Sequence, residues 1–568
     1  MLHPFTNNKF TNLPTLFKMK KYIAFLLLTA VFPTVTCGRL SADDRTFSIG
    51  KNLTIFNAVF RDLDLLYVDS LKYDKMTADA INYMLSQTDP YTVYLPEEDT
   101  EDIAMMTSGE YGGIGSVISQ RNNTIYISDP YEGMPAQQND IRAGDIISAI
   151  DGVSTEGMTV SDVSARLRGT PNTVINLQLK RYGEENPIER TFMREKIQVK
   201  SISYSSVVAD RTGYLLLNDF TDHSAIEVKQ AINEMVKQHR IRSLIIDVRG
   251  NGGGLIDEAV KIVGYFVPKG TAIVTTKGKE KSSERVFRTP SEPVYPDMKL
   301  AVITDRGSAS ASEILAGAIQ DLDRGVIVGE RTFGKGLVQN IRPIAYGGHL
   351  KVTTAKYYIP SGRGIQAIDY SNRNEDGSVG RVPEHLTSEF TTKNGRKVRN
   401  GGGILPDTLS NDERTLNIAY YLYADNLYFD YATKYKHEHP SIPSPDLFEL
   451  SDADFDDFTA FIKEKNFGYA TQTEKYFNEL IEIAKYEELY NRIAEDFESL
   501  KAKLVPDIDE NIKENKDDIV QLLTTEIIKR YYYQKGEIAY SLRTDKDLKI
   551  ALDILHSEEK YNRILSNE

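Results

Sequence analysis

Hydrophobic positions near the start of the chain recur at intervals of three or four residues, which places them on one face of a helix. These positions are Phe56, Val59, Phe60, Leu63 and Leu66. A second helical pattern stops at Asp89-Pro90, because the residue before a proline is pushed out of the α region. We therefore predict an N-terminal helical region over 43–104.

The pattern changes after Gly109 to short apolar runs separated by glycine turns. Segments 114–118, 124–128 and 146–150 are predicted strands, and 160–167 is a predicted helix. This size and order are typical of a compact domain of strands with two helices, which we place at 105–197.

From about residue 198 to 411, apolar strands alternate with amphipathic helices, as in 225–239 followed by 244–248. Such alternation favours an α/β core. Residues 366–403 interrupt it with a polar, glycine-rich stretch that we interpret as a long loop or insertion. Beyond residue 412 the pattern is helical to the end of the chain, so we predict a helical C-terminal domain over 412–568.

Composition and charge exclude several kinds of partner and site. The 568 residues carry a formal net charge of −14, which argues against a nucleic-acid partner because phosphate binding needs a basic surface. Cys37 is the single cysteine, which excludes an internal disulfide and a zinc site built on several cysteines.

A basic and then apolar segment precedes Cys37. Lys18, Lys20 and Lys21 come before an apolar run over 22–32 that is too short to span a bilayer. We predict an export signal over 1–37, with Met19 as the more natural start, and a location in the periplasm or cell envelope. Residues 34–37 weakly resemble a lipoprotein processing site, so membrane anchoring by a lipid on Cys37 and ordinary cleavage both remain open.

Ser310 is the strongest candidate for a catalytic nucleophile. It precedes an apolar helical face, and the small residues Ala309 and Ala311 beside it leave room for a substrate backbone. A serine becomes a nucleophile when a neighbouring base takes its proton, and a helix N-terminus favours a developing oxyanion. The alternative is that the serines at 308, 310 and 312 are only helix N-caps.

Lys335 stands between Gly334 and Gly336, 25 positions after Ser310. A lysine serves as a base when burial or nearby positive charge lowers its pKa toward neutrality. On an extended strand, residues 335 and 339 share a face, so the amide of Gln339 would lie beside the ammonium. The alternative is a solvated lysine in a glycine turn.

Two glycine clusters suggest anion contacts. Residues 250–254 follow an apolar strand, and the amide of Gly252 or Gly253 would contribute to an oxyanion hole. A phosphate-binding loop is disfavoured because the segment lacks the Lys-Ser/Thr pair that such a loop requires. The other alternative is a simple tight turn. The cluster of Gly112, Gly113, Ile114 and Gly115 precedes a strand, where amides could grip a terminal carboxylate while a peptide adds to the sheet.

Taken in order, these motifs resemble those of the carboxyl-terminal processing peptidases, also called tail-specific proteases. The resemblance runs from about residue 50 to 410. It is carried by Ser308-Ala309-Ser310-Ala311-Ser312-Glu313 and by the segments 67–69, 89–95, 112–115, 143–145, 168–170, 247–254, 333–339 and 404–407.

The resemblance implies a multidomain α/β protein. It implies a mostly-β PDZ domain at 105–197 inserted before a protease core related to the crotonase fold at 198–411. Ser310 would be the nucleophile, Lys335 the base and Gln339 the residue that positions it. Ala311 with Gly252 or Gly253 would form the oxyanion hole, and Arg168 would take part in gating.

The implied activity is serine endopeptidase cleavage through an acyl-enzyme, on protein substrates with free C-termini that the PDZ domain holds. It needs no metal or cofactor. Residues 412–568 lie outside the part of the chain that carries the resemblance. They would form a shelf, a homo-oligomer contact or an adaptor site. The competing hypotheses are a catalytically silent PDZ scaffold of the envelope and a crotonase-like acyl-CoA enzyme. Intact Ser310, Lys335 and Gln339 argue against the first, and the export signal against the second.

Overall fold

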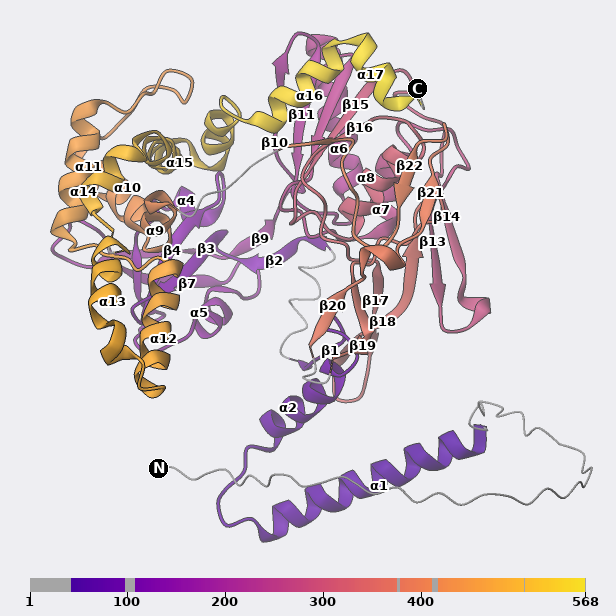
Figure 1. The fold of residues 1–568 in the computed structure, drawn as a ribbon, viewed down its shortest axis with the longest axis horizontal. Helices are drawn as coiled ribbons and strands as arrows, with labels where there is room; N and C mark the ends of the chain where they lie inside the picture. The colour runs from indigo at the N-terminus through magenta and orange to yellow at the C-terminus, as the bar shows by residue number, and fades with distance from the viewer. Residues whose placement is uncertain (1–41, 98–107, 375–377, 411–416, 505, 567–568) are drawn as a thin grey trace, which may run out of the picture. The chain divides into compact units, whose positions relative to one another are not determined.

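A computed structural model describes residues 42–97, 108–374, 378–410, 417–504 and 506–566 (Figure 1). The predicted export signal and Cys37 lie outside the described residues. Within these ranges, no helix is both long and apolar enough to cross a membrane. The chain divides into two compact units, Met1–Thr77 and Ala78–Glu568.

The first unit contains α1 (Ala42–Leu66) and the start of α2 (Tyr73–Ser86). The rings of Phe56 and Phe60 stack with centroids 6.3 Å apart, and Tyr73 lies 6.0 Å from Phe60. The predicted apolar stripe is therefore present on α1, although Val59 is exposed.

The predicted PDZ domain is built on a sheet in the order β3-β4-β5-β7-β8, with β6 beside β5 and a separate β2–β9 pair. Its elements are β2 (Glu110–Gly113), β3 (Ser116–Arg121), β4 (Thr124–Pro130), α4 (Pro135–Gln138), β5 (Ile146–Ile150), β6 (Val153–Ser154), α5 (Val160–Leu167), β7 (Val174–Lys180), β8 (Ile188–Met193) and β9 (Glu195–Gln198). Strand β3 lies at the end of this order, so one of its edges is open to pairing.

The centre of the predicted protease core is a six-stranded sheet in the order β10-β11-β12-β15-β16-β23, parallel from β11 onward. The sheet and its helices comprise β10 (Ile202–Ala209), β11 (Thr212–Leu217), α6 (Ser224–His239), β12 (Ser243–Asp247), α7 (Ile256–Val263), β15 (Lys299–Thr304), α8 (Ala311–Asp321), β16 (Val326–Gly329) and β23 (Thr408–Leu409). Strand β12 is buried along its whole length, as expected for a parallel strand covered on both faces.

A second sheet in the order β1-β18-β13-β14, with β17 beside β18, carries the loop of Lys335. Its elements are β1 (Val93–Leu95), β13 (Ala272–Gly278), η2 (Lys281–Ser283), β14 (Arg285–Arg288), β17 (Leu337–Pro343) and β18 (His349–Tyr358). Strand β1 falls in the region predicted as helical. It differs from that prediction because its backbone pairs with β18, about 250 residues away in sequence, which no local pattern reveals.

The predicted insertion at 366–403 forms two small hairpins, β19–β20 and β21–β22. Its elements are β19 (Ile368–Arg373), β20 (Val379–Arg381), η3 (Glu384–Leu386), β21 (Glu389–Thr391) and β22 (Lys397–Arg399). The segment is therefore ordered structure next to the core rather than one long loop.

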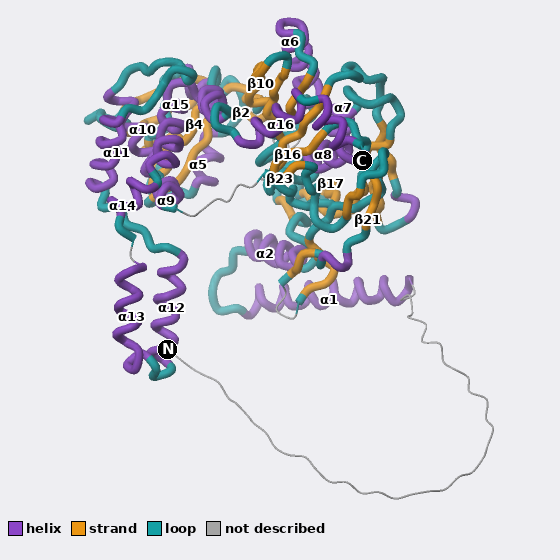
Figure 2. The backbone as a smooth tube through the Cα atoms, turned by 45° about the horizontal axis from the view of Figure 1, so that its top comes forward, coloured by secondary structure: helices purple, strands orange, loops and turns teal. Residues whose placement is uncertain are grey.

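The C-terminal part is helical. Its helices are α9 (Ile418–Ala424), α10 (Leu427–Glu438), α11 (Asp452–Glu464), α12 (Gln472–Tyr486), α13 (Tyr490–Leu504), α14 (Ile508–Glu514), α15 (Lys516–Ser541), α16 (Lys546–His556) and α17 (Glu558–Leu565). Tyr428, Phe458 and Ile527 belong to their shared core, whereas α12 and α13 lie side by side around a smaller core (Figure 2).

The last two helices belong to the protease core. Leu548, Ala551 and Tyr561 pack with Ile245 and Val328 of the parallel sheet. Helices α6, α7 and α8 pack on the opposite face, so α16 and α17 complete the second covering layer of the sheet (Figure 1).

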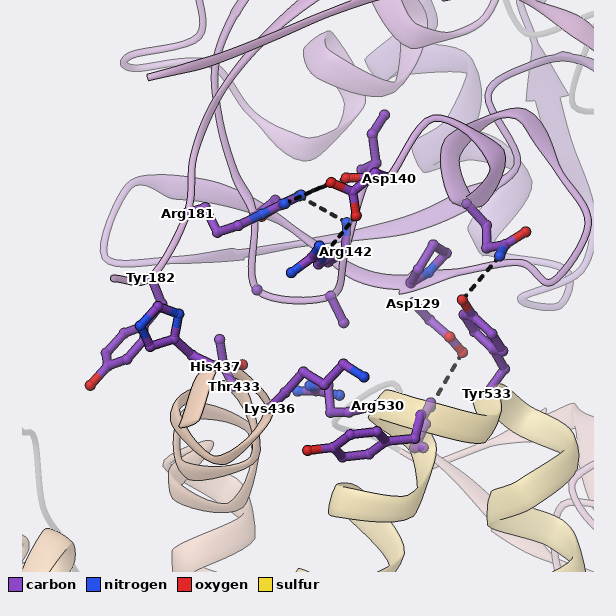
Figure 3. Close-up of a pocket in the computed structure, with 18 of the residues that line it drawn as sticks. Asp129, Asp140, Arg142, Arg181, Tyr182, Thr433, Lys436, His437, Arg530 and Tyr533 are labelled. Carbon is purple, nitrogen blue, oxygen red and sulfur yellow. Dashed lines mark hydrogen bonds and ion pairs between the residues drawn. The ribbon is translucent and has the colours of Figure 1, made fainter. Parts of the chain in front are cut away.

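The PDZ domain and the helical domain are joined by polar contacts. Arg121 pairs with Asp430 at 2.6 Å, and Gln137 Nε2 donates to Tyr533 Oη at 3.1 Å. Between them lies a cavity of about 550 Å³, with Asp140, Arg142 and Arg181 on the PDZ side and residues of α10 and α15 facing them (Figure 3). The helical domain thus contacts the PDZ domain at the end of β3 and at α4.

Candidate active site

Ser310 immediately precedes α8, and its neighbouring serines have different tasks. The Ser308 hydroxyl donates to Val248 O at 2.7 Å and the Ser312 hydroxyl to Asn251 O at 2.9 Å. Both are buried and tie α8 to the loop after β12, whereas Ser310 is partly exposed. Ser310 itself occupies the N-cap position of α8, so the N-cap alternative applies to it by position, and it is also the one of the three serines that is partly exposed to a substrate.

The backbone of Ser310 is held in an uncommon conformation, with φ of 56° and ψ of −113°. Such backbone costs about 1–3 kcal/mol and persists only where the surroundings enforce it. Here the Ser310 N–H donates to Glu313 Oε2 at 2.9 Å, and Tyr357 Oη donates to Ser310 O at 3.1 Å. The strain is typical of functional sites.

Lys335 lies on the same scaffold. Its N–H donates to Glu313 Oε2 at 2.8 Å, and Tyr357 Oη donates to its carbonyl oxygen at 2.7 Å. Burial lowers the pKa of the Lys335 ammonium, and the positive charge of Lys351 lowers it further. Both effects favour the neutral amine that a general base requires.

The ammonium of Lys335 rests on an aromatic ring. Its Nζ lies 4.4 Å from the ring centroid of Tyr91. The Asp89 carboxylate fixes the turn that presents this ring by accepting the N–H groups of Tyr91 and Thr92 at 2.8 and 2.9 Å. Residues 89–95 carry part of the family resemblance, but no local pattern in them predicts this role.

Gln339 is not hydrogen-bonded to Lys335. Its Nε2 donates to Thr353 Oγ1 at 3.1 Å, and the pairing of β17 with β18 shifts register between Val338 and Gln339. The shift breaks the simple alternation from which the sequence placed Gln339 beside Lys335. Within the described ranges, no hydrogen bond joins the Lys335 ammonium to Gln339 or to the Ser310 hydroxyl either.

Glu313 is the residue that sequence reasoning missed. Its fully buried carboxylate accepts the N–H groups of Ser310, Gly334 and Lys335 and the Thr332 hydroxyl, at 2.6–2.9 Å. Burial raises the pKa of Glu313 to about 7, against the opposing effect of these bonds. The available signal was a serine followed three residues later by a glutamate, the pattern of a helix capping box.

The oxyanion candidates lie where the loop after β12 meets α8. Gly253 is packed so closely that a Cβ there would lie 2.7 Å from the Ser310 Cβ and 2.9 Å from Ala311 N. The Gly253 amide donates to Asn251 Oδ1 at 2.8 Å, so it is already engaged. The exposed Gly252 amide and the Ala311 amide have no acceptor among the described residues, and they are the better-placed pair.

The glycine cluster at 112–115 closes one end of the open β3 edge. A Cβ on Gly112 would lie 2.0 Å from Gly169 O, and Gly115 has a φ of 71°. These positions therefore require glycine for close approach and for a left-handed backbone. Arg168, at the end of α5, lies with its guanidinium carbon 5.6 Å from the ring centroid of Tyr111. The cluster, including Ile114, and Arg168 thus share the PDZ side of the molecule, away from residues 308–313.

Three family models match successive parts of the chain. The family model described as "Peptidase family S41" matches residues 211–371, a "PDZ domain" model matches 126–181, and a model described as "Probable PDZ-protease, C-terminal helical domain" matches 418–555.

Similar proteins include a "Carboxy-terminal-processing protease" of Bartonella bacilliformis, 36% identical over 321 residues that cover 56% of this chain and 73% of the relative. A "Probable CtpA-like serine protease" of Staphylococcus aureus is 33% identical over 351 residues, which cover 60% of this chain and 69% of the relative. Among solved structures, a "photosystem II D1 C-terminal processing protease" is 28% identical, with a TM-score of 0.35 over 62% of this chain and 86% of the other.

Proposed function

The chain belongs to peptidase family S41 as a carboxy-terminal-processing serine protease with a PDZ domain, and from this premise we propose that it cleaves by a Ser310–Lys335 mechanism. One observation carries the proposal. The backbone N–H groups of Ser310 and Lys335 both donate to the same oxygen of Glu313, which places the two residues on one rigid support.

In this mechanism, Ser310 Oγ attacks the scissile carbonyl while Lys335 takes the hydroxyl proton. The amides of Ala311 and Gly252 stabilise the oxyanion. Lys335 then returns the proton to the leaving amine, and a water molecule hydrolyses the acyl-enzyme by the same route. Because the Lys335 ammonium rests on Tyr91, its side chain must turn toward Ser310 before the first step.

Substrate selection belongs to the PDZ domain. We propose that a substrate's C-terminal tail adds to the open edge of β3, with its carboxylate at residues 112–115. The C-terminus would thereby be held while an upstream segment reaches Ser310. Arg168 beside Tyr111 would couple the occupied groove to the protease core.

The test is cleavage of a loosely folded protein with a free, apolar C-terminus. We expect Ser310→Ala and Lys335→Ala to abolish cleavage. Lys356→Ala, an exposed lysine on β18, should cleave like the unmodified protein. Cleavage retained by Ser310→Ala would refute the nucleophile. If no form cleaves, a serine-reactive acylating probe separates a gated enzyme, labelled at Ser310, from a silent scaffold, which stays unlabelled.

We also propose export to the periplasm or cell envelope, supported by the basic and apolar pattern over 18–32. Fractionation of cells that express the full chain should place the protein outside the cytoplasm. Incorporation of labelled fatty acid that is lost in Cys37→Ser would assign a lipid anchor, and an unlabelled, processed chain would assign ordinary cleavage.

A further inference from the structure

The hairpins of the 366–403 insertion enclose a cavity of about 670 Å³ with a basic lining. Its charged residues are six cations and two carboxylates. The cations are Arg331, Arg363, Arg381, Arg396, Lys397 and Arg399, and the carboxylates are Glu389 and Asp407. This excess is unusual in a protein whose formal net charge is −14.

Both carboxylates are already paired. Glu389 pairs with Lys397 at 3.1 Å, and Asp407 pairs with Arg396 at 2.6 Å. Arg396 also pairs with Asp323 at 2.6 Å. These contacts neutralise Arg396 and Lys397 and leave no lining carboxylate for the other arginines.

Three arginines therefore lack an ion-pair partner among the described residues. Arg331 donates only to the carbonyl oxygen of Gly402 at 3.4 Å, and Arg399 only to the Thr387 hydroxyl at 3.1 Å. Arg381 is exposed and makes no ion pair there. Three like charges around one cavity repel each other unless a counter-ion joins them.

Arg363 adds a buried donor to the same lining. Its side chain is 1% exposed and pairs with Asp321 at 2.8 Å. Its Nε is buried and has no hydrogen-bond partner. A buried donor without an acceptor is uncommon in folded proteins, and here it indicates an acceptor that the chain itself does not supply.

The run Gly401-Gly402-Gly403 lets the arginines reach the cavity. A Cβ on Gly402 would lie 2.7 Å from an Arg331 terminal nitrogen, and Gly403 has a φ of 75°. Side chains at these positions would displace Arg331 from the wall. The glycine run noted in the sequence is thus explained by the space beside it.

We propose that this cavity binds a phosphate group, held by Arg331, Arg381 and Arg399. Three unpaired guanidinium groups call for more than one negative charge, which a carboxylate cannot offer. A phosphate monoester carries about −1.5 to −2 at neutral pH, and its oxygens match the planar fork of arginine. The source is either a soluble phosphate monoester or a lipid whose headgroup is a phosphate monoester, as in phosphatidic acid, and the two share this chemistry.

The site lies next to the catalytic scaffold without being part of it. Thr332, which follows Arg331, donates its hydroxyl to Glu313 and accepts the N–H of Ile404 at 2.6 Å. Phosphate binding does not depend on the proposed cleavage mechanism, so a binding experiment can fail or succeed independently of it.

The experiment is calorimetric titration of the purified full-length protein with inorganic phosphate, against sodium chloride of equal ionic strength. We expect saturable phosphate binding that Arg381→Gln/Arg399→Gln weakens at least tenfold. Lys393→Gln, an exposed lysine of the same insertion outside the cavity, should bind phosphate unchanged. Both altered arginines are exposed, and a matching thermal unfolding transition will show that the double variant folds.

Absence of phosphate binding beyond the chloride control, or equal binding by the double variant, would overturn the proposal. Sedimentation with vesicles that contain phosphatidic acid, compared with phosphatidylcholine vesicles, then identifies the source. Co-sedimentation that requires Arg381 and Arg399 assigns a lipid headgroup, and phosphate binding without co-sedimentation assigns a soluble phosphate compound.

Discussion

Glu313 holds the two proposed catalytic residues, Ser310 and Lys335, at the scale of single side chains. Its Oε2 accepts from Ser310 N and Lys335 N, and its Oε1 accepts from Gly334 N and the Thr332 hydroxyl. All four donors are directed at one buried carboxylate, so the proposed nucleophile and the proposed base share a single anchor. The anchor acts through backbone positions and need not touch the substrate.

Glu313→Gln should lower both stability and activity. An amide has one oxygen in place of two, so at least one backbone N–H is left without an acceptor, at about 1–3 kcal/mol each. We expect kcat/KM to fall at least tenfold, measured alongside urea unfolding. Glu330→Gln removes a surface partner of Arg306 and should change stability by about 0–1 kcal/mol, with normal activity. A fully active Glu313→Gln would contradict the anchor role.

Lys351→Met should move the acid limb of the pH–rate profile to higher pH. Burial is the larger cause of the lowered Lys335 pKa, and the charge of Lys351 adds to it. Removing that charge raises the Lys335 pKa, so neutral amine appears only at higher pH. The measurement is kcat/KM against pH, with Lys356→Met from the same strand as control. An unmoved or lowered limb would refute this coupling.

The lowered pKa of Lys335 also makes the stability of the protein depend on pH. This pKa is lower in the folded than in the unfolded chain, so the unfolded chain binds more protons between the two pKa values. The contribution of Lys335 to the free energy of unfolding therefore rises with pH across that interval and is smallest below it.

At the scale of elements, the site is a contact between a loop and a helix start. The loop after β12 meets the N-terminus of α8, and Ser308 and Ser312 bond across the contact. Gly253 occupies the closest point, with a φ of 104°. The spacing of the oxyanion amides is thus set by how closely two elements pack.

Gly253→Ala should abolish activity by forcing these elements apart. Its Cβ would lie 2.7 Å from Ala309 O and from the Ser310 Cβ. Gly270→Ala is the matched control, with a φ of 79° but no atom within 4 Å of the added Cβ. Both variants should lose stability because alanine is strained at such φ values. Only the first should lose at least tenfold in kcat/KM, and equal activities would count against close packing as the cause.

At the scale of the whole molecule, the start of α16 contacts Arg249, which follows strand β12 of the core. Arg249, two residues after the end of β12, pairs with the buried Asp247 at 2.5 Å, with Asp545 at 2.5 Å and with Asp547 at 3.1 Å. The carboxylates of Asp545 and Asp547 lie at the start of α16 and neutralise the charge of an arginine of the core. Helices α16 and α17 therefore belong to the stability of the protease core itself.

Asp545→Asn with Asp547→Asn should loosen this attachment. Asparagine keeps the volume and the N-cap that Asp545 provides to Leu548 N, so the charge is what changes. We expect the free energy of unfolding to fall by about 1–3 kcal/mol, the range of hydrogen bonds to charged groups. Asp553→Asn, an exposed position on α16, is the control for urea unfolding. Equal midpoints in both variants would show that the attachment is not electrostatic.

The sequence alone was sufficient to predict the helix after Ser310, the α/β alternation and the order of domains. Local periodicity and small flanking residues carry that information, because the positions involved are neighbours along the chain. The candidates Ser310 and Lys335 also came from local motifs. The structure places them on one support, as the proposed mechanism requires.

Only the tertiary structure decided what depends on distant contacts. Strand β1 exists because it pairs with β18, and Gln339 turns to Thr353 because a register shift interrupts the alternation of β17. The ion pair between Asp545, at the start of α16, and Arg249 likewise joins partners that no local pattern relates. Periodicity records which face of an element is apolar, whereas the partner of a buried polar group is fixed only when separate elements pack together.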